Sequence, residues 1–167
     1  MQVLPPSRFH YQKQRRFSFF AVHLALPILL GGVIYVCWRE PNLLMFTWLR
    51  ALGLESIVER LRFLAAPARN FIPHWMIYSL PDGLWVYALT AFTLLVWRDT
   101  DSSWMRVLWC SLGFLLGAGI ELGQLAGIVP GTFDYGDLIV CLIAPAAALL
   151  FTSRKLVFSK LILRESE

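Results

Sequence analysis

Residues 17–37 read FSFFAVHLALPILLGGVIYVC, a run of 21 residues without a formal charge. A transmembrane helix requires about 20 predominantly apolar residues, so this run predicts a helix that crosses a membrane. Polar and basic residues precede it, and it is longer than the apolar core of a cleaved signal peptide. We therefore expect a retained leader followed by a first membrane span.

The composition of the whole chain indicates the same class of protein. Hydrophobic residues make up 57% of it and charged residues 16%, whereas about 25% of the residues in soluble proteins are charged. The net charge of +4 comes mainly from Lys and Arg at the ends of apolar runs, where the positive-inside rule places them. We therefore expect membrane lipids, and no nucleic acid, as partners.

Three further apolar runs follow the first. They cover residues about 71–97, 104–125 and 137–153, and each is long enough to cross, or nearly cross, a bilayer. Together with the first run they predict an all-α fold, a polytopic membrane protein built as a four-transmembrane-helix bundle. No repeat or linker divides the chain, so residues 1–167 are expected to form a single integral membrane domain.

The segment at about 43–65, between the first two runs, has a different pattern. Apolar residues recur there at helical spacing while charged residues take another face, which is typical of an amphipathic helix on the membrane surface. The alternatives are a helix packed over the ends of the spans and part of a longer second hairpin. The apolar positions are Leu54, Ile57, Val58, Leu61 and Ala65, and the polar positions are Glu55, Glu59 and Arg62.

The distribution of Lys and Arg predicts the orientation. Basic residues occupy the leader, the connection at 98–106 and the tail after residue 153, whereas the connection between the third and fourth runs has none. The five arginines between the first two runs reduce this contrast, although two of them can pair with glutamates at helical spacing. The balance predicts that both termini lie in the cytoplasm and that the connection between spans three and four lies outside.

Acidic residues gather near the predicted outer side. Glu121 lies close to the end of the third run with Gln124 on the same helix face, and Asp137 lies where the fourth run begins. Gly117 and Gly113 sit one and two turns below Glu121, where they would let another helix approach closely. Interhelical hydrogen bonding is the structural alternative for Glu121 and Gln124, and helix capping is the alternative for Asp137.

Asp82 lies within the second run, in the stretch YSLPDGLW at 78–85. An ionisable residue inside a membrane is costly and marks a candidate functional site, although Asp82 could also cap a kinked helix. We expect the polar residues to converge on one outward-opening pocket. The predicted binding residues are Asp82, Glu121, Gln124, Asp134 and Asp137.

The cysteines offer no metal or redox motif. Cys37, Cys110 and Cys141 lie in or at the edges of apolar segments, and none has CxxC spacing. We therefore expect them to have packing roles, without a disulfide framework. The sequence predicts no metal site, no cofactor and no catalytic residue.

The stretch GAGIELGQLAGIVPGTFDYGDLIVCLIAP, residues 117–145, orders these features in a way that resembles the VanZ-like membrane proteins. That family carries a Glu-x-x-Gln pair at the end of a span, a short loop with an arginine, and an aspartate that opens the next span. Glu121 and Gln124 match the pair, Asp134 matches a frequent polar position of the loop, and Asp137 matches the opening aspartate. The resemblance covers mainly residues 113–150.

Three positions depart from the family pattern. Gly131 stands where the arginine is expected, and Cys141 and Ala144 stand where an asparagine and a glycine are expected inside the span. The named member of the family is linked to resistance to a glycopeptide antibiotic that carries a lipid tail. The resemblance therefore implies a multi-pass protein of the bacterial cytoplasmic (inner) membrane that acts on amphiphiles or cell-envelope precursors at the outer boundary.

Three functions are compatible with this sequence. The first is a non-enzymatic envelope protein whose polar groove binds or shields a lipid-like ligand, such as a glycopeptide-type antibiotic or an envelope precursor. The second is a small proton-coupled transporter, which with four spans and no repeat would act as a homo-oligomer. The third is a membrane-embedded enzyme with paired carboxylates as acid and base, but no GxSxG, HExxH or phosphate-loop motif supports it.

Overall fold

The computed structural model describes residues 17–97 and 102–164. Within these residues the chain folds into helices joined by turns, which confirms the predicted all-α class. The elements in chain order are the π-helical turn η1 (Ala21–Ala25), α2 (Leu26–Trp38), α3 (Leu44–Ala51), α4 (Glu55–Ala65), the 3-10 helix η2 (Ala66–Phe71), α5 (His74–Tyr78), α6 (Leu80–Val96), α7 (Ser103–Cys110), α8 (Leu112–Leu125) and α9 (Tyr135–Arg164).

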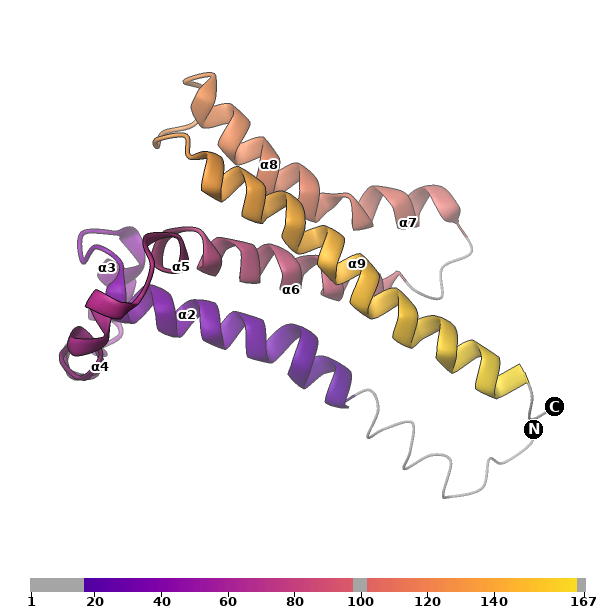
Figure 1. The fold of residues 1–167 in the computed structure, drawn as a ribbon, viewed down its shortest axis with the longest axis horizontal. Coiled ribbons are helices and arrows are strands. Elements are labelled where there is room, and N and C mark those ends of the chain that lie inside the picture. The colour runs from indigo at the N-terminus through magenta and orange to yellow at the C-terminus, as the bar shows by residue number, and fades with distance from the viewer. Residues whose placement is uncertain (1–16, 98–101, 165–167) are drawn as a thin grey trace.

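The described helices form four long segments that lie along the molecule in alternately opposite directions (Figure 1). These segments are η1 with α2, α5 with α6, α7 with α8, and α9. α6 packs against α2 and also against α8 and α9. α3 and α4 lie at one end of α2, and the turn between α8 and α9 lies at this same end, whereas the C-terminal part of α9 lies at the opposite end (Figure 1).

Two helical stretches, Phe17–Trp38 and Tyr135–Thr152, are long and apolar enough to cross a membrane. Only 22% of each stretch is buried, whereas the core helix of a soluble protein would be mostly buried. α6 and α8 are apolar but shorter, at 17 and 14 residues. Length and composition alone therefore support two of the four predicted spans.

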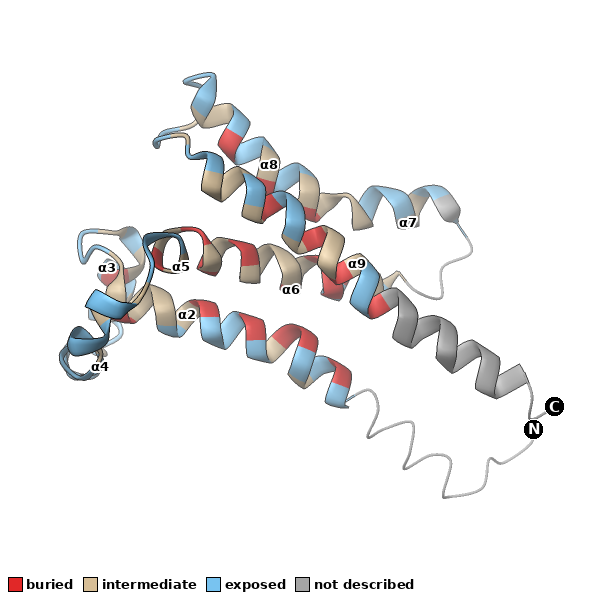
Figure 2. Cartoon of the chain, viewed as in Figure 1, coloured by how far each residue is buried: buried red, intermediate tan, exposed pale blue. Residues whose placement is uncertain are grey.

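The core lies between the long segments. Figure 2 shows buried positions on the inner sides of α2, α6, α8 and α9, and exposed positions on their outer sides. The hydroxyl of the fully buried Thr90 donates to the carbonyl of Val86 in its own helix (2.9 Å), as expected where no water is available. His23 Nδ1 lies 2.7 Å from the hydroxyl of Tyr87 and joins η1 to α6.

Glycines allow the central helices to pack closely. A Cβ atom on Gly83 of α6 would collide with the side chain of Val140 in α9, and one on Gly113 of α8 would collide with Thr90 of α6. Gly117, one turn after Gly113, is buried as well. The prediction that Gly113 and Gly117 let a neighbouring helix approach is confirmed, because backbones can meet only where side chains are small.

The fourth long helix is longer than predicted. α9 begins at Tyr135 rather than at Asp137, and it continues to Arg164 instead of ending near residue 153. The early start has a local cause. The carboxylate of Asp134 accepts a hydrogen bond from the backbone amide of Gly136 (2.6 Å), and so satisfies an amide that has no partner within the helix.

The second and third segments are each interrupted once. In the second, α5 ends before Ser79 and α6 begins after it, so the interruption precedes Pro81, which stands in the first turn of α6. Proline is favourable at that position because the first-turn amides lack helical partners in any case. The third segment is interrupted at Ser111, whose hydroxyl donates to the carbonyl of Leu108 (2.8 Å).

The amphipathic segment consists of two helices rather than the single helix predicted at 43–65. α3 and α4 are joined by a turn in which Gly53 has a φ of +72°, a left-handed conformation that glycine adopts without steric cost. The predicted apolar positions are divided between the side of α4 nearer the protein and its exposed side. The partly buried positions are Leu54, which directly precedes α4, and Val58, Arg62 and Ala65 within it, whereas Ile57, Leu61, Phe63 and Leu64 are exposed.

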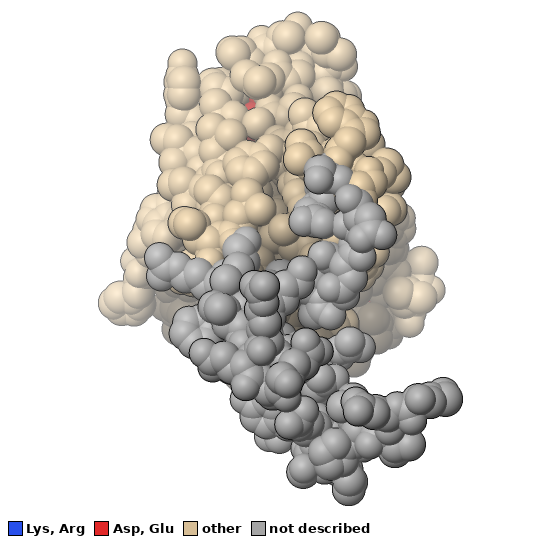
Figure 3. Space-filling model, turned by 90° about the vertical axis from the view of Figure 1, so that its right-hand side faces the viewer, with Lys and Arg blue, Asp and Glu red and all other residues tan. Residues whose placement is uncertain are grey.

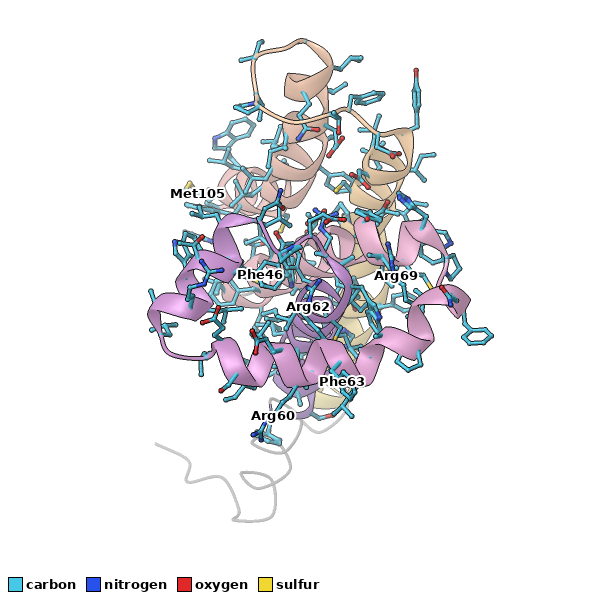
Figure 4. The ribbon with its side chains drawn as sticks, turned by 90° about the vertical axis from the view of Figure 1, so that its left-hand side faces the viewer. Phe46, Arg60, Arg62, Phe63, Arg69 and Met105 are labelled. Carbon is cyan, nitrogen blue, oxygen red and sulfur yellow. The ribbon has the colours of Figure 1, made fainter. Side chains whose placement is uncertain are left out.

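Arg62 has a structural role that its position in the amphipathic pattern did not indicate. Its Nη1 donates to the carbonyl oxygens of Val36 (3.0 Å) and Arg39 (2.8 Å), at the C-terminal end of α2. Figure 4 shows Arg62 directed from α4 toward Phe46, while Arg60 points away from the bundle. The sequence grouped Arg62 with Glu55 and Glu59 as polar positions, but in the structure Arg62 is directed toward α2, because it satisfies carbonyls that lack partners in their own helix.

Candidate functional site

Four acidic residues lie at the end of the bundle where α3 and α4 are found. Asp82 is in the first turn of α6, Glu121 is in α8, Asp137 is in the first turn of α9, and Asp134 immediately precedes α9. The charge of Asp82 interacts with those of Glu121 and Asp137, and the charge of Glu121 interacts with those of Asp134 and Asp137. We call these four residues the acidic cluster.

Glu121 faces the protein. It is 7% exposed. Gly113, Gly117 and Glu121 are spaced four residues apart, so they share the side of α8 that packs against the neighbouring helices. Its Oε2 accepts a hydrogen bond from the backbone amide of Asp134 at 3.4 Å. This bond ties the end of α8 to the start of α9, which is the connecting role that the sequence left open for Glu121.

Gln124 lies one turn further along α8, against Gly131 of the following loop. A Cβ atom on Gly131 would be 2.6 Å from Nε2 of Gln124, and the φ of Gly131 is +138°. An arginine at position 131, as the VanZ-like pattern has, would collide with Gln124 and strain the backbone. In this chain, a positive charge beside the acids has to come from another element.

The two loop-proximal aspartates have different roles. Asp134 is exposed and caps α9 through its bond to the amide of Gly136. The capping role that the sequence allowed for Asp137 therefore belongs to Asp134. Asp137 is half-buried in the first turn of the helix, and its Oδ1 is buried without a hydrogen-bond partner among the described residues.

Arg39 supplies positive charge next to Asp82. It follows the last residue of α2, and its guanidinium interacts electrostatically with the Asp82 carboxylate. The two groups are not in direct contact, since Arg50 and Glu55 alone form an ion pair within the described part of the chain. Nη1 of Arg39 donates to the carbonyl of Tyr78 (3.3 Å), and Nε is buried without a hydrogen-bond partner in the described residues.

Aromatic rings hold the Arg39 guanidinium in place. It lies 5.2 Å from the centre of the Tyr35 ring and 5.1 Å from that of Tyr78. Arg69 approaches Tyr78 as well, at 5.8 Å from the ring centre and 3.5 Å from the hydroxyl. Cation–π contacts of this kind position arginine without neutralising its charge.

Sequence reasoning missed Arg39 as a site residue. In the sequence it directly follows Trp38 at the end of the first apolar run, where a basic residue is expected to anchor a helix at the membrane boundary. No spacing relates it to Asp82, which is 43 positions away. Only the packing of α2 against α5 and α6 brings the two together.

The remaining polar groups do not assemble a metal centre in the described part of the chain, where no three His, Cys, Asp or Glu side chains are placed to hold an ion. Cys37 and Cys141 are buried, and Cys141 packs against Gly117, which agrees with a packing role. Carboxylates can bind cationic groups, and a guanidinium can bind anionic groups, by charge-assisted hydrogen bonds.

No protein-family model, curated protein or solved structure matches this chain.

Proposed function

We propose that this chain is a VanZ-like integral membrane protein of the cell envelope that binds a lipid-like, amphiphilic ligand at its outer boundary. Asp82, Glu121, Gln124, Asp134 and Asp137 are its proposed binding residues. The observation that carries the proposal is that Asp82, Glu121 and Asp137, from α6, α8 and α9, lie at one end of an apolar bundle, near enough for their charges to interact. Ionisable groups gathered in this way inside a membrane protein mark functional sites.

The apolar exterior of the bundle supports a membrane environment. Large apolar side chains are exposed on the outer sides of the helices, among them Leu29 and Val33 of α2 and Ile143 and Leu150 of α9. Figure 3 views the bundle from the end where the C-terminal part of α9 lies, and the outer sides of the described helices there carry few Asp or Glu side chains. A soluble monomer rarely exposes so much continuous apolar surface.

All four long segments are suited in length to a bilayer. α5 with α6 covers 74–96, and α7 with α8 covers 103–125, so each would extend about 34 Å at ~1.5 Å per residue. The hydrocarbon core of a bilayer is about 30 Å thick. At the two interruptions, Ser79 is buried in the protein and the hydroxyl of Ser111 donates to a carbonyl of its own segment. An interrupted helix can lie within a membrane only where its polar groups are covered by protein or hydrogen-bonded in this way.

The exposed apolar residues of α3, α4 and η2 support a position in the outer leaflet. Trp48 is 60% exposed, Phe63 80% and Phe71 87%. A helix that lies on a membrane buries such side chains among the lipids and turns its polar side elsewhere. In α4 that other side carries Arg62, which faces the end of α2.

The orientation and location follow from the charge distribution of the sequence. With the basic leader and tail in the cytoplasm, the acidic cluster opens to the outer side of a bacterial inner membrane. An amphiphile in the outer leaflet could then reach it from the lipid or from the water. The chain's resemblance to the VanZ-like proteins is consistent with this arrangement.

Ligand binding by the purified full-length protein in detergent micelles tests the proposal. Native mass spectrometry would measure the retention of dodecylamine, phosphatidylethanolamine, phosphatidylcholine and phosphatidylglycerol. We expect at least one ammonium-bearing amphiphile to bind, and Glu121→Gln to weaken that binding while the exposed control Glu59→Gln does not. Equal binding by the two variants, or no binding of any amphiphile, would refute the function. Uptake that depends on a proton gradient would instead favour the transporter.

A further inference from the structure

We propose that the first half of the turn between α8 and α9, residues 126–130, inserts into the acyl chains of the outer leaflet. We call these residues the apolar turn. The inference rests on the membrane placement in the proposed function, and it adds a lipid-binding surface outside the acidic cluster. Lipid hydrocarbon, rather than a second protein, is the partner that the chemistry of this turn fits.

α8 ends in a hydrogen-bonded cap that fixes the backbone of the apolar turn. Gly127 has a φ of +69°, and its amide donates to the carbonyl of Gln124 (3.0 Å). The amide of Ile128 donates to the carbonyl of Gly123 (2.8 Å). These two bonds make a Schellman motif, in which a left-handed glycine ends a helix. Ile128 is therefore held in one backbone position.

Ile128 lacks the apolar contact that commonly completes this motif. The residue after the left-handed glycine usually packs against the side chain at the position whose carbonyl it binds, or at the position before it. Here the first position is Gly123, which has no side chain, and Leu122 before it is 52% exposed. Val129 occupies the space over Gly123, where an added Cβ would lie 2.7 Å from its Cγ2. Ile128 is left 80% exposed on a fixed backbone.

The backbone of the apolar turn has no unpaired N–H. The amides of residues 126–129 all donate to carbonyls in the last turns of α8, at 2.8–3.1 Å, and Pro130 has no N–H. An unpaired backbone donor is costly in contact with lipid, because hydrocarbon offers no acceptor. Water imposes no such requirement, so the complete pairing of these amides favours lipid as the partner.

The surface of the apolar turn is uncharged and continues one side of α8. No charged residue occurs between Glu121 and Asp134. Leu115, Leu122 and Leu125 are 61%, 52% and 61% exposed, and their spacing of seven and three residues places them along one side of the helix. A partner recognised by charge would find no counter-charge here, whereas hydrocarbon needs none.

A second apolar element lies at the same end of the bundle. Figure 4 views this end and shows the turn between α8 and α9 on one side and α4 on the opposite side. Phe63 and Leu64 of α4 are exposed, and the proposed function places them in the outer leaflet. Insertion on both sides would hold this end of the bundle at the depth of the lipid headgroups, where the polar part of an amphiphile lies.

Fluorescence quenching by brominated lipids tests the inference on the full-length protein in phosphatidylcholine bilayers. Single cysteines at Ile128, Leu29 and Thr132, in a background without the native cysteines, would carry an environment-sensitive fluorophore. Leu29 is exposed in the middle of the first span, and Thr132 is exposed in the second half of the turn. We expect brominated acyl chains to quench the label at Ile128 by at least about half of the loss seen at Leu29, and to leave Thr132 unquenched.

Two further variants separate lipid contact from packing within the protein. Ile128→Ser should leave the melting temperature in micelles unchanged, because Ile128 has little contact with the rest of the protein. Val129→Ala should lower it, because Val129 packs on Gly123. Melting curves of the labelled proteins verify that each is folded. A similar loss of stability for both variants would show that Ile128 packs within the protein, and would overturn the inference.

The quenching outcomes distinguish this inference from the proposed function. If Leu29 is quenched and Ile128 is as wet as Thr132, the membrane placement stands and the insertion of the turn is wrong. If neither Leu29 nor Ile128 is quenched, both fail. If Ile128 is shielded from water but not quenched, a second copy or another protein covers the turn, and the lipid assignment is overturned.

Discussion

Nη1 of Arg62 donates a hydrogen bond to the carbonyl oxygen of Arg39 at 2.8 Å. The amphipathic helix α4 is thereby joined to the residue whose side chain lies beside the acidic cluster. Trp38 adds a second bond between the same elements, from its Nε1 to the carbonyl of Ala65 at 3.0 Å. The surface segment and the candidate site therefore share one attachment point at the end of α2.

Arg62→Gln is expected to loosen this attachment. The substitution removes a charged donor from two carbonyls at the end of α2, which should lower the free energy of unfolding by about 1–3 kcal/mol. Thermal melting in micelles gives the measurement, and Arg60→Gln is the matched control. Equal melting temperatures for the two variants would show that the bonds from Arg62 contribute little.

Spin labels along α4 should report three environments. We expect lipid contact at Phe63 and Leu64, which are 80% and 74% exposed, water contact at Glu59, and protein contact at Val58. The physical reason is that exposed apolar groups at the membrane boundary are stabilised by lipid. Oxygen and nickel-chelate accessibility would distinguish these environments, and equal wetting of all four positions would exclude a surface helix.

Gly131→Ala is expected to destabilise the loop before α9. The φ of +138° is unfavourable for any side chain, and the new Cβ would meet Gln124, so we expect a loss of about 1–3 kcal/mol. Gly32→Ala is a suitable control because nothing lies within 4 Å of its Cβ position. Adding Gln124→Ala should recover the steric part of the loss but not the backbone strain.

Gly83→Ala is expected to separate α6 from α9. The added methyl group would collide with Val140, and overpacking in a dense interface costs about 1–3 kcal/mol. The double variant Gly83→Ala with Val140→Ala should recover much of this stability, which a double-mutant cycle measures. Additive losses in the cycle would contradict the direct contact.

The topology can be tested with single cysteines in a background without the native ones. Thr132 is exposed in the loop before α9, and a cysteine there should react with a membrane-impermeant maleimide added from outside. A cysteine at Ser166, which lies outside the described residues, should react only after the membrane is opened. The reverse pattern would place the acidic cluster on the cytoplasmic side.

The sequence by itself determined the helical class and the neighbourhood of Glu121, Asp134 and Asp137. Apolar runs favour helices because every backbone polar group is satisfied within the segment. The short connection between the third and fourth runs keeps the ends of the two helices close, so these acids could be expected to meet. These inferences depend on periodicity and on residues that are near one another in the chain.

The tertiary structure decided which residues complete the site and how α4 is turned. Arg39 lies near Asp82 only because α2 packs against α5 and α6, and no sequence period encodes the proximity of residues 43 positions apart. Arg62 turns toward the bundle because the unpaired carbonyls at the end of α2 attract a donor. An amphipathic pattern shows that a helix has two faces, but the neighbouring groups determine which face meets the protein.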